Sequence, residues 1–278
     1  MGFYERLMTL DRRVVYLAMA LAVAIPLFIP RFRVPIYVTR EVKSVYDFVE
    51  SLKEGDRLLL AIDYDPMGMA ELHPMALTIS RQCFAKGVKL FFVTLSQNAP
   101  GMAEQLVSKL SKEYNKKNGV DYVYLGYKPY PGLVILSMGQ NFRISFPMDY
   151  YGTPVDSMPI MQGVRNYDDM KAVIAFESGW VADSWIADAN GRYKIPVGLG
   201  VTGVMAADYF PYVQSKQIFG LIGGLKGAAE YETLAKAKER SASRGMKVQT
   251  ITHAVVILFI IIGNIGFFMS KKRKKTTE

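Results

Sequence analysis

Two uncharged apolar stretches, one near each end of the chain, most constrain how this sequence can fold. Residues 248–269 are 22 positions without a formally charged side chain, and a helix needs about 20 such residues to cross a hydrocarbon core roughly 30 Å thick. Residues 14–30 are also uncharged and extend about 25 Å as a helix, near the short end of that requirement. We therefore predict a transmembrane helix at each of these two places.

A cleavable signal peptide is the competing interpretation of residues 14–30. Signal peptides end in a pattern of small residues at the cleavage site. Here the apolar run ends instead in residues 29–33, which read IPRFR. We therefore expect an anchor that stays attached to the mature protein.

Basic residues flank both predicted helices, so the positive-inside rule decides between two close alternatives. The densest cluster is Lys271–Lys275, directly after the second helix, and it matches segments that are attracted to an anionic cytoplasmic surface. We expect the N-terminus (residues 1–13) and the basic tail (residues 270–278) in the cytoplasm and the intervening domain outside it. The predicted location is the cell membrane, and the first predicted partner is the lipid bilayer.

The rest of the composition argues against two other classes. The net charge is +9, and residues 271–278 supply +4 of it, so +5 remains for the other 270 residues. So small an excess over that length does not indicate a nucleic-acid-binding face. The single cysteine, Cys83, excludes an internal disulfide, and we expect it to be a small buried apolar side chain.

Between the apolar stretches, short apolar runs alternate with amphipathic runs. The predicted strands cover residues 58–65, 89–96, 120–127, 170–177 and 195–204. The predicted helices cover residues 69–86, 101–117, 131–140, 180–193 and 208–240. The apolar content of residues 131–140 would also suit a strand, and Pro211 and the glycines are the places where the last helix could be broken. Strand–helix units in series predict a parallel sheet with helices on both faces. The expected fold class is therefore α/β: one flavodoxin-like or Rossmann-like domain of about five strands, flanked by the two transmembrane helices.

The predicted α/β domain spans residues 57–240. Strand order does not follow from the sequence, and we take 2-1-3-4-5 as the default. Residues 31–56 are expected to form a linker and an amphipathic helix. Residues 141–168 break the alternation and are expected to form a long loop, a kind of segment that is often functional.

Ligands of open parallel sheets bind beyond the carboxyl ends of the strands, and this rule selects the candidate binding residues. Two tyrosines of the long loop join them, because tyrosine is common on binding surfaces. The candidates are Asp63, Asp65, Ser96, Gln97, Tyr127, Tyr150, Tyr151, Glu177, Ser178 and Thr202.

Asp63 and Asp65 are the candidate catalytic pair. Two carboxylates two residues apart at a strand end can hold a divalent cation or divide acid and base roles. The Asp-x-Asp pattern resembles the first motif of the haloacid-dehalogenase superfamily, and residues 94–96 (TLS) are similar to its second motif. The resemblance implies a metal-dependent hydrolase or transferase that uses Mg²⁺.

The resemblance covers only these few residues. Met67 and Gly68 stand where that family prefers Thr or Val, no lysine has a clear third-motif setting, and residues 168–169 (DD) precede the fourth predicted strand where the family's acids follow it. The interpretation that we favour is that Asp65 caps the helix beginning near Met69 and Asp63 binds loop backbone.

Four glycines fall inside the final predicted helix: Gly220, Gly223, Gly224 and Gly227. Glycine costs about 1 kcal/mol in a helix relative to alanine, so four in one stretch need a reason. Close packing supplies it, either within the domain or between copies of the chain.

These observations predict a membrane-anchored binding or assembly module that belongs to a homo-oligomer or to a larger membrane complex. The alternative is the metal-dependent enzyme built on Asp63 and Asp65. No cofactor is predicted under the first hypothesis, Mg²⁺ is predicted under the second, and nucleic acid is predicted under neither.

Overall fold

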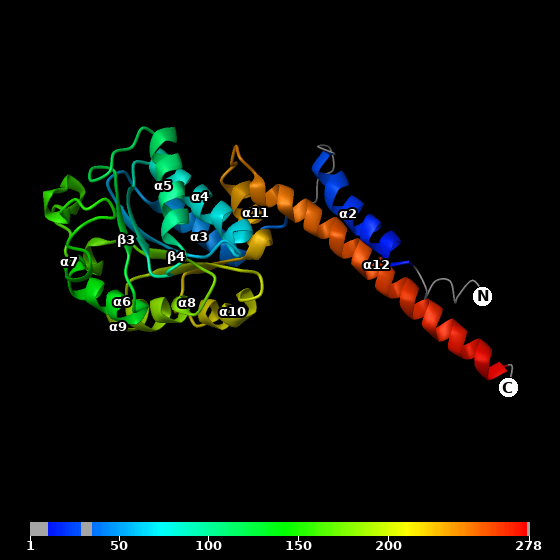
Figure 1. The fold of residues 1–278 in the computed structure, drawn as a ribbon. Helices are drawn as coiled ribbons and strands as arrows, with labels where there is room; N and C mark the ends of the chain where they lie inside the picture. Colours follow the sequence, from blue (N-terminus) through cyan, green and yellow to red (C-terminus); the bar gives the residue numbers. More distant parts are fainter. Residues whose placement is uncertain (1–10, 29–34, 277–278) are drawn as a thin grey trace. The chain divides into compact units, whose positions relative to one another are not determined.

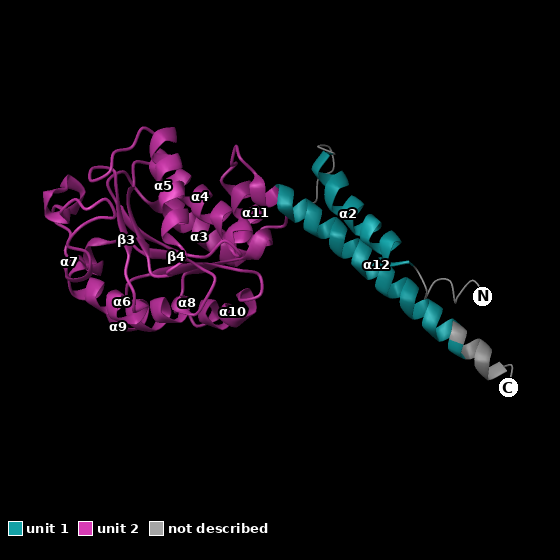
Figure 2. Cartoon of the chain, viewed as in Figure 1, with its two compact units in different colours: residues 1–35, 244–278 teal, residues 36–243 magenta. Residues whose placement is uncertain are grey.

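The computed structural model of the chain describes residues 11–28 and 35–276. It divides into two compact units, residues 36–243 and residues 1–35 together with 244–278 (Figure 2). The predicted domain began at residue 57, whereas the observed unit also includes the amphipathic helix that precedes it. Parts of the predicted N-terminus, linker and tail (residues 1–10, 29–34 and 277–278) lie outside the described residues.

A single parallel sheet forms the centre of the larger unit. Its strands are β1 (Arg57–Asp63), β2 (Lys89–Thr94), β3 (Tyr122–Tyr127), β4 (Val173–Glu177), β5 (Val197–Val201) and β6 (Gly220–Gly223). The order is β3-β2-β1-β4-β5-β6, which is typical of Rossmann-type sheets. The α/β prediction is confirmed, whereas the default order 2-1-3-4-5 and the number of five strands are wrong.

Helices cover both faces of this sheet (Figure 1). One face carries α3 (Arg40–Ser51), α4 (Met69–Ala85), α5 (Pro100–Glu113) and α11 (Gly224–Leu234). The other carries α6 (Pro131–Gln140), α8 (Val181–Ser184), a π-helix (Trp185–Asn190), α9 (Gly191–Tyr193) and α10 (Ala206–Gln214). With both faces covered, β1 is buried along nearly its whole length, which explains its continuous apolar sequence.

The predicted long helix over residues 208–240 is wrong as a single element, because β6 separates α10 from α11; the interruption falls among the glycines, which is one of the two places where a break was considered. Gly220 lies in β6, where a Cβ atom would come within 2.5 Å of Val45 Cγ2 on α3. Gly224 begins α11 at a φ of +60°, and a Cβ there would come within 2.8 Å of the Gly203 Cα. A Cβ on Gly223 would lie 2.7 Å from Ala206 Cβ, and one on Gly227 would lie 3.0 Å from Ile222 Cγ2. The glycines therefore permit close packing within the domain, as predicted. They do so from β6 and from the first turns of α11, and not from within one long helix.

The long loop packs against its own domain. It contains α7 (Phe142–Ser145) and the 3-10 turns Val155–Ser157, Pro159–Met161 and Tyr167–Asp169. Tyr150 stacks on Tyr124 of β3 with 4.6 Å between ring centroids, and its amide donates to the Tyr124 carbonyl over 2.8 Å. The loop thus covers the β3 edge of the sheet, while Tyr150 and Tyr151 stay about half exposed.

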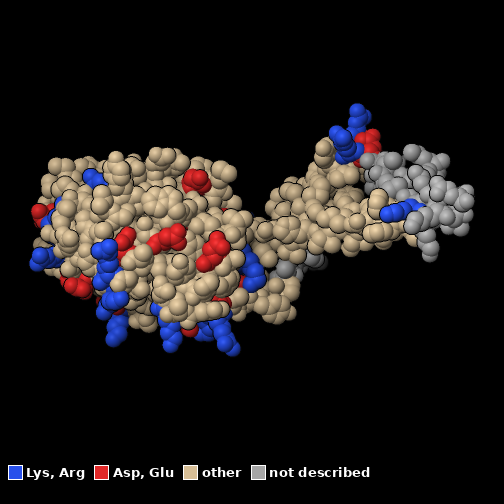
Figure 3. Space-filling view, turned by 90° about the horizontal axis from the view of Figure 1, so that it is seen from below, with Lys and Arg blue, Asp and Glu red and all other residues tan. Residues whose placement is uncertain are grey.

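The smaller unit consists of apolar helix. Within α12 (Ser241–Thr276), residues Ser241–Met269 contain an 18-residue window with a mean hydropathy of 2.3, of which 6% is buried, and this is the one helix among the described residues that is long and apolar enough to cross a membrane. The N-terminal stretch forms α2 (Arg12–Phe28), a helix of 17 residues. Figure 3 shows Lys and Arg near the ends of these helices and little charge between them. The structure thus supports a C-terminal helix of membrane length and, in the part that it describes, shows no second span.

Candidate functional site

A cavity of about 400 Å³ opens at the carboxyl edge of the sheet. It lies beyond β1 and β4, where the strand order changes direction, and such a crevice is the usual ligand site of open α/β sheets. We refer to it as the crevice. Its lining residues are Asp63, Asp65, Leu95, Ser96, Gln97, Asn98, Tyr127, Tyr130, Pro131, Ser178, Gly179, Trp180 and Val181.

The structure brings six of the ten candidate binding residues together in this crevice. They are Asp63, Asp65, Ser96, Gln97, Tyr127 and Ser178. Glu177 lies beside Asp63, as its register partner on β4, but does not line the crevice. Thr202 follows β5 and also lies outside the lining, as do Tyr150 and Tyr151 on the long loop.

Asp63 ends β1 on the floor of the crevice. Its Oδ1 accepts hydrogen bonds from the backbone amides of Leu95 and Ser96, the latter over 3.2 Å. The interpretation that Asp63 binds loop backbone is therefore confirmed. Its Oδ2, however, is buried without a hydrogen-bond partner. A buried carboxylate oxygen is costly to leave unpaired, so this atom needs a physical account.

Glu177 is the neighbour that explains part of how the Asp63 carboxylate is tolerated. It is fully buried beside Asp63, and burial together with the negative charge of Asp63 raises the pKa of Glu177 well above its ordinary value. Burial also raises the pKa of Asp63 to about 6, and the two backbone amides limit that rise. Both carboxyl groups therefore favour the protonated form more than free carboxyl groups do, and Glu177 does so without the two backbone amides that favour the charged form of Asp63.

Trp185 completes this buried cluster. Its indole lies close enough to Asp63 and Glu177 to oppose both pKa rises. Neither its Nε1 nor the two Glu177 oxygens reach full hydrogen-bond geometry, so the polar atoms are near one another but incompletely paired. Trp185 is also the first residue of the π-helix, and single π-helical turns are frequent at functional sites.

Asp65 is bound to the turn that precedes α4. Its Oδ1 accepts from the amides of Met67 over 3.1 Å and Gly68 over 3.0 Å. The prediction that Asp65 caps α4 is wrong, because Gly68 is the residue at the helix start, no side chain caps the helix, and Asp65 binds the preceding turn instead. The turn between β1 and α4, near which Rossmann-type sheets usually bind phosphate, therefore already uses two of its amides to hold a carboxylate of the chain itself.

Aromatic side chains surround the opening of the crevice. Trp180 is 65% exposed and Tyr130 is 74% exposed, and both line the cavity with Tyr127. Tyr130 has a φ of +61°, a left-handed conformation that costs a tyrosine about 1 kcal/mol or more and that clusters at functional sites. Sequence analysis did not select Tyr130, Trp180 or Asn98. The aromatic run at residues 127–131 contained a signal for Tyr130, whereas the other two carry none.

The side chains that could coordinate a metal ion in the crevice are few. Among the described residues, no group of three or more His, Cys, Asp or Glu side chains converges in a way that could hold one. The crevice offers two carboxylates, and one oxygen of each is already bound to backbone amides. Mg²⁺ prefers near-octahedral oxygen coordination, so this set would leave most positions to water or ligand.

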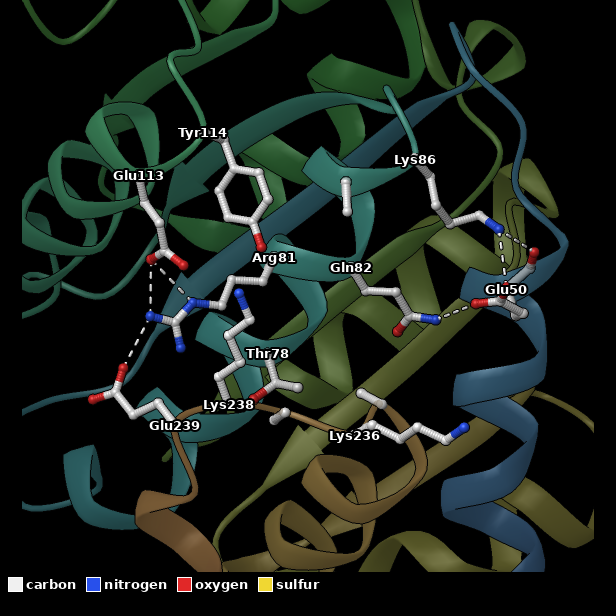
Figure 4. A pocket seen from close by; sticks show the side chains of 13 residues that line it. Glu50, Thr78, Arg81, Gln82, Lys86, Glu113, Tyr114, Lys236, Lys238 and Glu239 are labelled. Carbon is white, nitrogen blue, oxygen red and sulfur yellow. Dashed lines mark hydrogen bonds and ion pairs between the residues drawn. The ribbon is translucent and has the colours of Figure 1, made fainter.

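A second cavity of about 400 Å³ lies between α3, α4, α5 and residues 235–239 (Figure 4). Arg81 forms ion pairs there with Glu113 over 2.8 Å and with Glu239 over 2.9 Å. Lys86 pairs with Glu50 over 3.3 Å. Because these charged side chains pair with one another, we interpret the lining of the second cavity as a network of ion pairs. The network holds residues 235–239, before α12, against the rest of the domain.

Comparisons of the chain with protein-family models, with curated proteins and with solved structures gave no match. The site therefore has to be interpreted from its own geometry.

Proposed function

We propose that this chain is a membrane-anchored binding module that takes a small molecule in the crevice. The observation that carries the proposal is the position of the cavity, at the carboxyl ends of β1 and β4, together with six polar or aromatic side chains that the strand-end rule selects. A cavity of about 400 Å³ is of the size that holds a small ligand.

The proposed anchors are the two apolar stretches. The apolar and exposed surface of α12 supports the C-terminal one, because such a surface is stable in lipid and not in water. The N-terminal anchor at residues 14–30, the cytoplasmic termini and a domain outside the cytoplasm belong to the same proposal and rest on the sequence alone.

The crevice can be tested by filling it. Gly179 lines it, and a Cβ atom there meets nothing within 4 Å, so Gly179→Trp is expected to fold and to occlude the cavity. Gly101 on α5 is equally open and lies outside the crevice, so Gly101→Trp is the matched control. We expect a small molecule to copurify with the wild type and the control in mild detergent, detected by native mass spectrometry, and to be missing from Gly179→Trp. Equal loading of all three proteins contradicts the proposal.

We also propose that the module assembles, as a homo-oligomer or within a larger membrane complex. Met67 and Val204 support this, since they are 91% and 88% exposed on loops at the edge that holds the crevice, and exposed apolar groups favour association. Val204→Asp is expected to lower the mass of the detergent-solubilised particle. Val120→Asp, at an exposed valine before β3, is the control and should leave that mass unchanged.

The enzyme alternative keeps one specific support, the raised pKa of Asp63 with its free Oδ2, which suits acid–base chemistry. Mg²⁺ binding separates the two candidates. A folded Asp63→Asn, Asp65→Asn double variant that loses a Mg²⁺ affinity present in the wild type favours the enzyme.

A further inference from the structure

The charges of the crevice are of one sign. Of its lining residues, Asp63 and Asp65 are charged, and the lining contains no Lys, Arg or His. The nearest basic residue in sequence, Lys128, lies over the Phe146 ring with its Nζ 6.0 Å from the centroid. The lining therefore supplies negative charge and no positive counterpart.

The burial of Asp63 makes the lack of positive charge in the lining significant. Its side chain is 2% exposed, its Oδ2 has no partner, and the residue lines the floor of the cavity. A buried carboxylate is normally paired, and Glu177, the group beside it, is itself acidic. Glu177 and Trp185 lie beside this carboxylate, but the lining of the crevice offers it no positive charge.

The same geometry opposes an anionic ligand. The amides of Met67 and Gly68, in the turn before α4, are bound to Asp65, so a phosphate at this turn would have to displace that carboxylate. Without a basic side chain in the lining, nothing would compensate an anion beside Asp63. Nucleotides and sugar phosphates are thereby disfavoured.

The aromatic lining distinguishes an organic cation from a metal ion. Trp180, Tyr127 and Tyr130 belong to the lining, and aromatic rings attract ammonium groups but contribute nothing to Mg²⁺ coordination. Gln97, Asn98 and the two serines add neutral hydrogen-bonding groups for the remainder of a ligand.

We infer that the crevice binds a small organic cation, a protonated or quaternary amine whose charged nitrogen meets Asp63 and whose alkyl surface meets the aromatic lining. The inference rests on the proposed function and names the ligand class of the same site.

Calorimetric titration of the full-length protein in detergent tests it. The probes are choline, ethanolamine and 1,4-diaminobutane, with 3,3-dimethyl-1-butanol as the neutral analogue of choline and with MgCl₂ and sodium phosphate as inorganic controls. We expect at least one amine to bind and the neutral alcohol, Mg²⁺ and phosphate not to compete with it.

Two variants locate the binding. Asp63→Asn should weaken amine binding by about thirtyfold or more, because a buried charge pair is lost. Trp180→Ala, at an exposed side chain whose loss the fold tolerates, should weaken it about tenfold through the lost cation–π contact. Asp168→Asn removes an equal charge from an exposed acid outside the crevice and should have no effect.

Three results overturn the inference: no amine binds more tightly than the neutral alcohol, both variants bind amine as the wild type does, or phosphate displaces the amine. Its failure is distinct from that of the proposed function. If Gly179→Trp removes a copurifying molecule that is neutral or anionic, the proposal of a binding module is supported and the proposal of a cationic ligand is refuted.

Discussion

Asp63 combines two requirements that conflict. Its carboxylate has to be charged to attract a cation, yet its burial beside Glu177 makes that charge costly to the folded state. The backbone amides of Leu95 and Ser96 offset part of the cost but reach only Oδ1. An asparagine at this position could accept the same two hydrogen bonds without a buried charge. An aspartate here is therefore a candidate for a functional residue.

This conflict predicts a pH dependence of stability. The folded-state pKa of Asp63 is raised from 3.8 to about 6, so between these values the folded protein binds protons that the unfolded chain releases. The contribution of Asp63 to stability is then fully present below about pH 4 and is lost as the pH rises through about 6, by on the order of 3 kcal/mol. Glu177, whose pKa is also raised, acts in the same direction.

Asp63→Asn should therefore stabilise the protein at pH 7 and flatten its profile of melting temperature between pH 4.5 and pH 7. Circular dichroism of the solubilised full-length chain measures this, with Asp168→Asn as the exposed control. If the Asp63→Asn and wild-type profiles run parallel, the carboxylate of Asp63 is not the cause.

For single residues, the sequence predicted the lining of the crevice best where those residues lie at or just after the end of a strand. Asp63, Asp65 and Ser96 were predictable because an apolar run shows where a buried strand ends, and the ends of parallel strands share one edge. Trp180 and Trp185 were not, since their places depend on how residues 180–193 divide into a helix and a π-helix. A helical period does not reveal such a division.

Among the elements, β6 shows the same limit. A strand of four residues that begins and ends with glycine has too little pattern to stand out from the helical periods around it. Strand order was equally unreadable, because hydropathy records that β3 is buried and not which strand lies beside it. Residues 131–140 were predicted as a helix although their apolar content also suits a strand, and the structure confirms the helix, which has Pro131 at its first position.

The packing of α3 on β6 predicts a large effect of one methyl group. In Gly220→Ala the new Cβ would meet Val45 Cγ2, the Glu41 carbonyl and the Val45 amide at 3.0 Å or less, and the two backbone atoms cannot move aside cheaply. We expect a loss of about 1–3 kcal/mol in the free energy of unfolding. Gly101→Ala, where the Cβ meets open space in α5, should be neutral or gain up to about 1 kcal/mol. Urea unfolding compares them, and equal midpoints refute the packing argument.

Two buried glutamates of α11 fasten the neighbouring helices at their starts. Glu230 accepts from the Thr39 amide over 2.8 Å at the start of α3. Glu232 accepts from the amides of Ala242 and Ser243, each over 2.8 Å, at the start of α12. These bonds satisfy helix-start amides that have no partner within their own helix.

Glu232→Gln should loosen the start of α12, because one oxygen that accepts an amide is replaced by an NH₂ group. A buried amide left unpaired costs about 1–3 kcal/mol, so hydrogen exchange at Ala242 and Ser243 should accelerate roughly tenfold or more. Glu54→Gln, at an exposed acid, is the control. Unchanged exchange at both amides would show that Glu232 does not hold this helix.

For the whole molecule, the decisive question is the number of spans. One span in α12 places residues 1–13 on the same side as the domain, whereas two spans place them with the tail. Cys83 is fully buried, so the wild type is expected to stay unlabelled by a membrane-impermeant maleimide, and single cysteines can then report on sidedness.

Three variants settle it: Gly2→Cys before the first stretch, Ser157→Cys at an exposed position of the domain, and Glu278→Cys in the tail. Two spans with a positively charged cytoplasmic tail predict that Ser157→Cys is labelled on intact cells and that the other two are labelled only after lysis. Labelling of Gly2→Cys together with Ser157→Cys would leave α12 as the single anchor. Labelling of Glu278→Cys on intact cells, with Ser157→Cys protected, would place the crevice in the cytoplasm, and its ligand would then have to be sought among cytoplasmic amines.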